Sequence, residues 1–97
     1  MRIENTICRY IREDLSNRVD ARVSALAAIG IESSQEAFVR AAVADFNTSP
    51  ERQAIAEVVI ATARSADSKV PAHITDDELR VNLALHIHLD SLDEEAA

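Results

Sequence analysis

The sequence predicts a mostly α-helical fold, a compact bundle of about four helices in a single domain over residues 1–97. Three observations favour this class. Apolar residues recur at helical spacing along most of the chain. Only one glycine, Gly30, and two prolines, Pro50 and Pro71, are present, so the turn residues of a many-stranded protein are missing. With one tyrosine, two phenylalanines and no tryptophan, the modest core must be built from Ala, Val, Ile and Leu.

The first predicted segment runs from about residue 3 to residue 29. Its apolar residues recur every four positions, at Ile3, Ile7, Ile11, Leu15, Val19 and Val23. Because each helical residue turns by about 100°, such a row drifts by about 40° per step and crosses to the far side of the helix. The segment is therefore either one long helix wrapped by its neighbours or two elements that meet near Arg12. Gly30 then supplies the left-handed residue typical of a helix C-terminus.

Two more helices are predicted in the middle of the chain. The motif SSQE fits a capping box in which Ser33 caps a helix over 34–47 and Glu36 reaches back to it. The motif SPE at Ser49 is a second start signal, because it combines a cap, a proline in the first turn and an acid near the positive helix end. It begins a helix over 50–66, whose β-branched run VVI should need tertiary burial.

The last segment supports two interpretations. The motif TDDE, Thr75 to Glu78, is another capping box and the strongest helix start in the chain. The next residues alternate between apolar and other side chains, which is typical of a strand over 80–89. The capping box and the Leu and Ala content favour a helix, apolar nearly all round, that is either central and buried or part of a dimer seam. Short strands at 6–11, at 80–89 or at both remain the alternatives.

The two histidines of the stretch LALHIHLDSL raise the question of a metal site. On a helix, His86 and His88 point about 200° apart and cannot bind one metal, whereas on a strand they share a face with Asp90. A structural zinc site also needs four ligands. The remaining nitrogen and sulfur donors, Cys8 and His73, stand in no CxxC or HxxxH spacing. We therefore expect no metal and no other cofactor.

Catalytic motifs are not recognisable either, since the chain has no GxSxG, no phosphate-cradling glycine loop and no HExxH. We expect a protein that is not an enzyme. The single cysteine, Cys8, favours a reducing, cytoplasmic environment. The N-terminus lacks the apolar run of a signal peptide, and the longest apolar run, residues 25–29, is far too short for a membrane span.

Charge is unevenly distributed. Residues 1–47 carry six arginines against seven acidic residues, whereas residues 48–97 carry four basic residues against ten acidic ones. An acidic surface repels phosphate backbones and attracts basic proteins. We therefore predict a small acidic interaction module that binds or inhibits a basic partner protein, with a frayed acidic tail at 93–97. Helix capping and solubility are the competing roles for the predicted partner-binding residues, which are Asp76, Asp77, Glu78, Asp93, Glu94 and Glu95.

Residues 6–46, TICRYIREDLSNRVDARVSALAAIGIESSQEAFVRAAVADF, suggest an alternative. This stretch resembles the ribbon-helix-helix regulators of the Arc, MetJ and CopG type, which include many antitoxins. The residues that match the two helices of that pattern are Glu13, Asp14, Leu15 and Val19, and then Gly30, Phe38, Val39, Arg40, Ala42 and Val43.

The resemblance implies a strand at 6–11 that pairs with a dimer mate and lies in the DNA major groove. Cys8 and Tyr10 would face the bases, with Arg9 and Arg12 beside them. Two departures stand out: Arg12 replaces the usual proline, and Arg9 falls on the face that should be buried. The implied function is a DNA-binding transcriptional regulator or antitoxin with an acidic partner-binding second half. Both interpretations favour a homodimer, because a core poor in phenylalanine gains from pairing.

Overall fold

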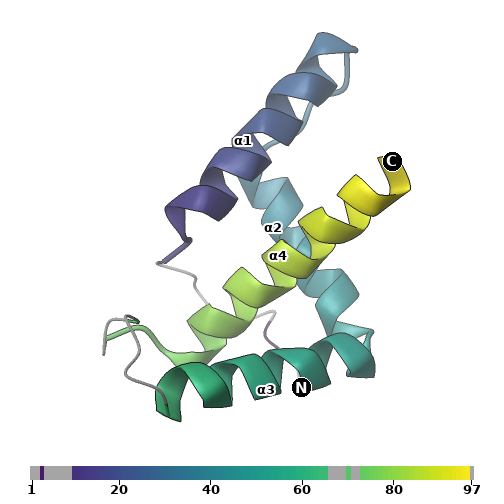
Figure 1. The fold of residues 1–97 in the computed structure, drawn as a ribbon. Coiled ribbons are helices and arrows are strands. Elements are labelled where there is room, and N and C mark those ends of the chain that lie inside the picture. Colours follow the sequence, from purple (N-terminus) through teal and green to yellow (C-terminus); the bar gives the residue numbers. More distant parts are fainter. Residues whose placement is uncertain (1–2, 4–9, 66–69, 71–72, 97) are drawn as a thin grey trace.

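The computed structural model describes residue 3, residues 10–65, residue 70 and residues 73–96, and it is mostly helical (Figure 1). Its elements in chain order are α1 (Glu13–Ala28), α2 (Gln35–Asn47), α3 (Pro50–Ser65) and α4 (Asp76–Ala96). The predicted bundle of about four helices is confirmed. The radius of gyration of 13.8 Å is close to the roughly 13 Å expected of a folded chain of this size.

The longest helix, α4, is central. It packs against all three other helices, whereas α1 and α3 do not contact each other (Figure 1). The strand predicted as an alternative at 80–89 is wrong, because these residues lie within α4. Residues two apart on a helix point about 200° from each other, so strict alternation places apolar side chains on opposite faces. A helix surrounded by three neighbours needs such a distribution.

The other suggested strand, at 6–11, lies largely outside the described residues. Tyr10 and Ile11 are described and belong to neither a helix nor a strand. Because α1 begins only at Glu13, a single continuous helix from residue 3 to residue 29 is wrong. The other interpretation placed a boundary near Arg12, and α1 does begin there. The first of the two elements that it expected lies largely outside the described residues.

Side-chain caps fix the helix starts. Ser34, not Ser33, caps α2, and its hydroxyl accepts a hydrogen bond from the Ala37 backbone N–H at 3.1 Å. The predicted box was therefore one residue out of register, since two adjacent serines offer the same local chemistry. The predicted start of α3 is confirmed, because the Ser49 hydroxyl accepts from the Arg52 backbone N–H at 3.2 Å.

Gly30 ends α1 as predicted. Its φ of 82° is positive, and it donates its N–H to the Ala27 carbonyl while Ile31 donates to the Leu26 carbonyl. These two hydrogen bonds form a Schellman motif, which satisfies carbonyls that the helix end would otherwise leave open. A residue with a side chain would be strained at this φ.

The core lies on two sides of α4. One buried cluster joins α1, α2 and α4 and consists of Leu15, Val19, Phe38, Ala42, Leu85 and Leu89. A second cluster joins α2, α3 and α4 and consists of Ile3, Phe46, Ala56, Val81 and Ala84. The two phenylalanines of α2, one in each cluster, fill the spaces on either side of α4.

Candidate interaction surfaces

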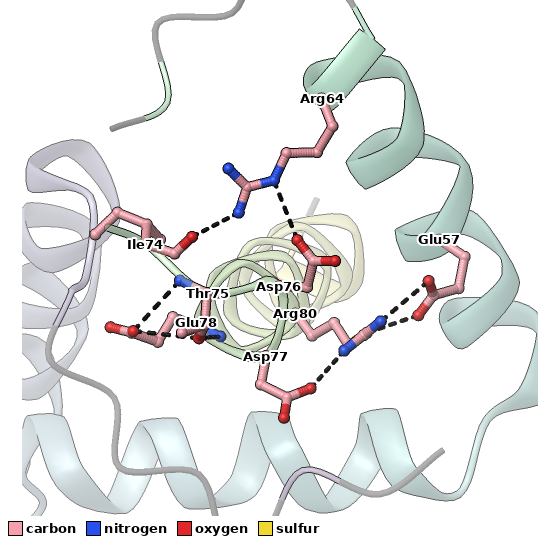
Figure 2. A network of polar contacts seen from close by, with 8 residues as sticks. All are labelled: Glu57, Arg64, Ile74, Thr75, Asp76, Asp77, Glu78 and Arg80. Atoms are coloured by element: carbon pink, nitrogen blue, oxygen red, sulfur yellow. Dashed lines mark hydrogen bonds and ion pairs between the residues drawn. The ribbon is translucent and has the colours of Figure 1, made fainter. Parts of the chain in front are cut away.

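The N-terminus of α4 is held by a reciprocal capping box (Figure 2). The Glu78 backbone N–H donates to the Thr75 hydroxyl oxygen at 3.1 Å. In return the Thr75 hydroxyl and backbone N–H donate to Glu78 Oε1 at 3.2 and 3.5 Å. Glu78 is only 8% exposed. The predicted capping box is confirmed, and the carboxylate of Glu78 is used inside the fold.

Arginines of α3 and α4 bind the other two acids of this turn (Figure 2). Arg64 Nε lies 3.1 Å from Asp76 Oδ1, and its Nη2 donates to the Ile74 carbonyl at 2.5 Å. Arg80 pairs with Asp77 of its own helix and reaches across to Glu57 of α3.

The contact between Glu57 and Arg80 ties α3 to α4. It is bidentate, with Nε to Oε1 at 2.7 Å and Nη2 to Oε2 at 3.3 Å. These hydrogen bonds from Arg80 lower the pKa of Glu57, and the same bonds raise the pKa of Arg80. The pair therefore holds both groups charged at neutral pH.

A second acidic group lies near the C-terminal end of α4 and faces α1. Arg18 Nη2 binds Asp90 at 3.0 Å and Asp93 at 2.8 Å, and Arg22 Nη2 binds Asp93 at 2.6 Å. The hydrogen bonds from Arg22 and then Arg18 lower the pKa of Asp93. The structure places residues 93–96 in α4, and the fraying expected of the acidic tail stays a prediction.

Glu94 and Glu95 differ from the other predicted partner-binding residues. Both are exposed, and neither forms an ion pair. The six residues singled out by the sequence therefore divide between two ends of α4. Four of them contact other groups of the chain, and only Glu94 and Glu95 are without such a contact.

Positive and negative groups of the described surface differ in how many of them are paired within the chain. Every arginine among the described residues lies within 4 Å of a carboxylate of the chain, as found for Arg12, Arg18, Arg22, Arg40, Arg52, Arg64 and Arg80. By contrast, six exposed acids in this part of the chain form no ion pair, namely Glu13, Asp20, Glu32, Glu51, Glu94 and Glu95. The described surface therefore presents unpaired negative charge and paired positive charge.

The two histidines of α4 contact different carboxylates. His86 Nε2 lies 3.1 Å from Asp90 Oδ2 on the same helix, whereas His88 Nδ1 lies 2.8 Å from Asp45 Oδ2 on α2. Within the described ranges, no group of three or more His, Cys, Asp or Glu side chains could hold a metal ion. His73 is exposed, and Cys8 lies outside the described residues.

Of the residues named for DNA contact, Cys8 and Arg9 also lie outside the described part of the chain. Arg12 is exposed, but its guanidinium binds Asp14 at 3.1 Å. The backbone from Tyr10 to Arg12 is fastened to α4 by Asn82, which accepts from the Arg12 N–H at 2.9 Å and donates to the Tyr10 carbonyl at 2.8 Å. The DNA-binding alternative stays a prediction, which a gel shift with upstream DNA would test.

One surface feature was missed by the sequence reasoning. The β-branched run of α3 was expected to be buried, yet only Ile60 is. Val58 is 67% exposed, Ile55 48% and Val59 43%. Val59 and Ile60 also line a mostly apolar groove of about 360 Å³ between α3, α4 and the start of α1. The signal that could have found this face is the absence of charged residues at positions 54, 55, 58, 61, 62 and 65, which recur at helical spacing.

Among the described residues, no helix is both long enough and apolar enough to cross a membrane. The comparisons with known proteins are negative: no family model, no curated protein and no solved structure matches this chain.

Proposed function

We propose that this protein is a non-enzymatic, acidic, helical interaction module that binds, and in binding inhibits, a basic partner protein. The observation that carries the proposal is the charge balance of the described surface. Each described arginine lies within 4 Å of a carboxylate of the same chain, while six exposed carboxylates are unpaired. Such a surface attracts cationic partners and repels phosphate backbones. The single cysteine, Cys8, favours action in a reducing compartment such as the cytoplasm.

The C-terminal end of α4 is the proposed contact region. Here Asp90, Asp93, Glu94 and Glu95 outnumber the two arginines that face them, Arg18 and Arg22. The backbone carbonyls at a helix C-terminus carry a further partial negative charge. A lysine or arginine of a partner would therefore meet several negative groups at once. Asp76, Asp77 and Glu78 have a different role, because their carboxylates already hold the start of α4.

Charge complementarity of this kind acts mainly on the rate of association, and salt weakens it. The probe for the experiment is a fluorescently labelled oligolysine peptide, whose binding to the full chain is measured by anisotropy over a series of sodium chloride concentrations. We expect Glu94→Gln combined with Glu95→Gln to weaken binding by about 0.2–1 kcal/mol for each lost charge, with the loss shrinking as salt rises.

Glu32→Gln combined with Glu51→Gln is the matched control, because it removes the same charge from exposed, unpaired carboxylates elsewhere. We expect the control to bind almost as well as the natural chain. Equal losses in both double variants would show that net charge alone attracts the peptide, and the proposed contact region would be wrong. Binding that salt does not weaken would contradict the electrostatic mechanism itself.

A further inference from the structure

The outward face of α3 is an exposed helical surface without charge. From Ala54 to the end of the helix it consists of Ala54, Ile55, Val58, Ala61, Thr62 and Ser65, all exposed. We call these six residues the α3 stripe. No charged residue interrupts these six positions, although charged residues make up 28% of the chain. In Figure 1, α3 lies along one edge of the molecule, and of the other three helices it packs against α2 and α4.

The hydroxyls of the two polar residues in the stripe donate their hydrogen bonds within α3 and do not need water as an acceptor. The Thr62 hydroxyl donates to the Val58 carbonyl at 2.9 Å, and the Ser65 hydroxyl donates to the Thr62 carbonyl at 3.2 Å. Both hydroxyls therefore have partners within their own helix. Burying the stripe against another surface would leave no unpaired hydroxyl donor, so the usual cost of desolvating polar groups is small here.

The β-branched residues of α3 give a reason to expect burial. Val58 and Val59 restrict their own side-chain rotamers in a helix, and so they support helix formation less well than leucine or alanine. In the isolated chain Val58 is 67% exposed and receives little packing energy in return. Contact with a second surface would recover the apolar burial that this part of the helix lacks.

We propose that the α3 stripe is a homodimer interface, in which it packs against the same stripe of a second copy, antiparallel and about a two-fold axis at Val58. A two-fold interface requires a patch that is complementary to itself. In this register Val58 meets Val58 of the second copy, Ile55 meets Ala61, and Ala54 meets Thr62. On either side of the central valine pair, a larger side chain opposes an alanine, which allows the two helices to approach closely.

The net charge of the chain also favours a second copy as the molecule that covers the α3 stripe. Two chains that each carry a formal charge of −7 repel one another, and a neutral face lets them meet where repulsion is least. In this register Glu51 of one copy lies opposite Ser65 of the other, so the two Glu51 carboxylates stay at opposite ends of the contact. The antiparallel arrangement also sets opposite helix dipoles side by side.

The size of the stripe sets the expected strength. A 16-residue helix is about 24 Å long, so one helix pair buries less than the roughly 1,200–2,000 Å² of a standard stable interface. We therefore expect a dimer that dissociates reversibly with dilution. Salt should strengthen it by screening the repulsion between the two acidic chains. This dependence is opposite in sign to that of oligolysine binding, so the two proposals fail or succeed separately.

The test is sedimentation equilibrium of the full chain over a range of protein concentrations. We expect Val58→Glu to raise the dissociation constant about tenfold or more, because the two-fold axis brings the two new charges together. Ala44→Glu is the matched control: it adds the same charge at an exposed position of α2, outside the stripe, and should leave the dimer intact. Circular dichroism checks that each variant keeps its helices, which is expected because both sites are exposed.

A mixing experiment tests the register. Chains with Val58→Glu and chains with Val58→Lys should each be monomeric alone and should form a heterodimer when mixed, because opposite charges then meet at the axis. A natural chain that stays monomeric at all concentrations would overturn the proposal and leave the stripe to a different partner protein. A dimer that Val58→Glu does not weaken, or a mixture that does not associate, would overturn the assignment to Val58 and this register.

Discussion

Helices α3 and α4 resemble each other in sequence but differ in their surroundings. Both begin with a hydroxyl cap followed by acids, and both carry apolar residues on more than one face. In α4, Val81, Ala84, Leu85 and Leu89 are each 2% exposed or less, since three helices surround it. In α3, only Ala56 and Ile60 are buried. The number of neighbouring helices, rather than composition, decides how much of each apolar surface is covered.

This difference separates two roles. The buried side chains of α4 join both core clusters, so α4 should account for much of the free energy of unfolding. The exposed side chains of α3 contribute little to that free energy and remain free for association. Three substitutions test this division of roles, and they follow in order of decreasing loss.

Leu85→Ala should cause the largest loss. Leu85 is fully buried in the cluster between α1, α2 and α4, and truncating a buried leucine costs about 2–5 kcal/mol. Urea denaturation at low protein concentration measures the free energy of unfolding. The matched variant on α3 is Ile55→Ala, which should cost less than about 1 kcal/mol because that side chain is half exposed. Similar losses for the two variants would contradict the division of roles.

Asn82→Ala tests the more deeply buried of the two buried polar residues of α4. Its side chain donates to the carbonyls of Tyr10 and Glu78, both at 2.8 Å, and accepts from the Arg12 N–H. Removing the amide leaves part-buried backbone groups without these partners, at a cost of about 1–3 kcal/mol. Hydrogen exchange of the Arg12 amide should speed up in the variant. The exposed Asn17 of α1 provides the control, because Asn17→Ala should change neither stability nor this exchange rate.

Glu57→Gln should give the smallest effect, because it weakens one partly exposed ion pair between α3 and α4. At neutral pH we expect a loss of about 0.2–1 kcal/mol. Folding lowers the pKa of Glu57 through its hydrogen bonds from Arg80, so the unfolded chain binds this proton more tightly. The stabilisation is therefore present above the unfolded glutamate pKa of about 4.3 and is lost as the pH falls through the folded pKa.

Thermal unfolding of the natural chain and of Glu57→Gln over a pH series checks this sign. The difference in melting temperature should be present at neutral pH and vanish in acid. Glu32→Gln is the control, since Glu32 is exposed and unpaired and its variant should follow the natural chain. A difference that persists in strong acid would show that the substitution at position 57 disturbs packing rather than charge.

Local chemistry allowed most helix ends to be predicted. Gly30 ends α1, Ser49 caps α3, and Thr75 with Glu78 starts α4, because each contact lies within a few residues of sequence. The same logic failed by one residue at Ser34, where two adjacent serines are equally suited to cap. The acids named as candidate partner contacts could be found from composition. Their engagement by Arg18, Arg64 and other arginines could not, because those side chains come from other helices.

Sequence alone was enough for the helical class, the end of α1 at Gly30, the approximate bounds of α2 and α3, the start of α4 and the acidic excess of the second half. Periodicity, capping and charge are properties of short stretches, so they can be recognised without knowing which distant segments pack together. The packing of the helices was needed to establish that residues 80–89 are helical at the centre of the bundle and that the outward face of α3 is left uncovered. Both outcomes depend on which helices pack together, and this choice rests on the summed burial of many side chains over the whole chain.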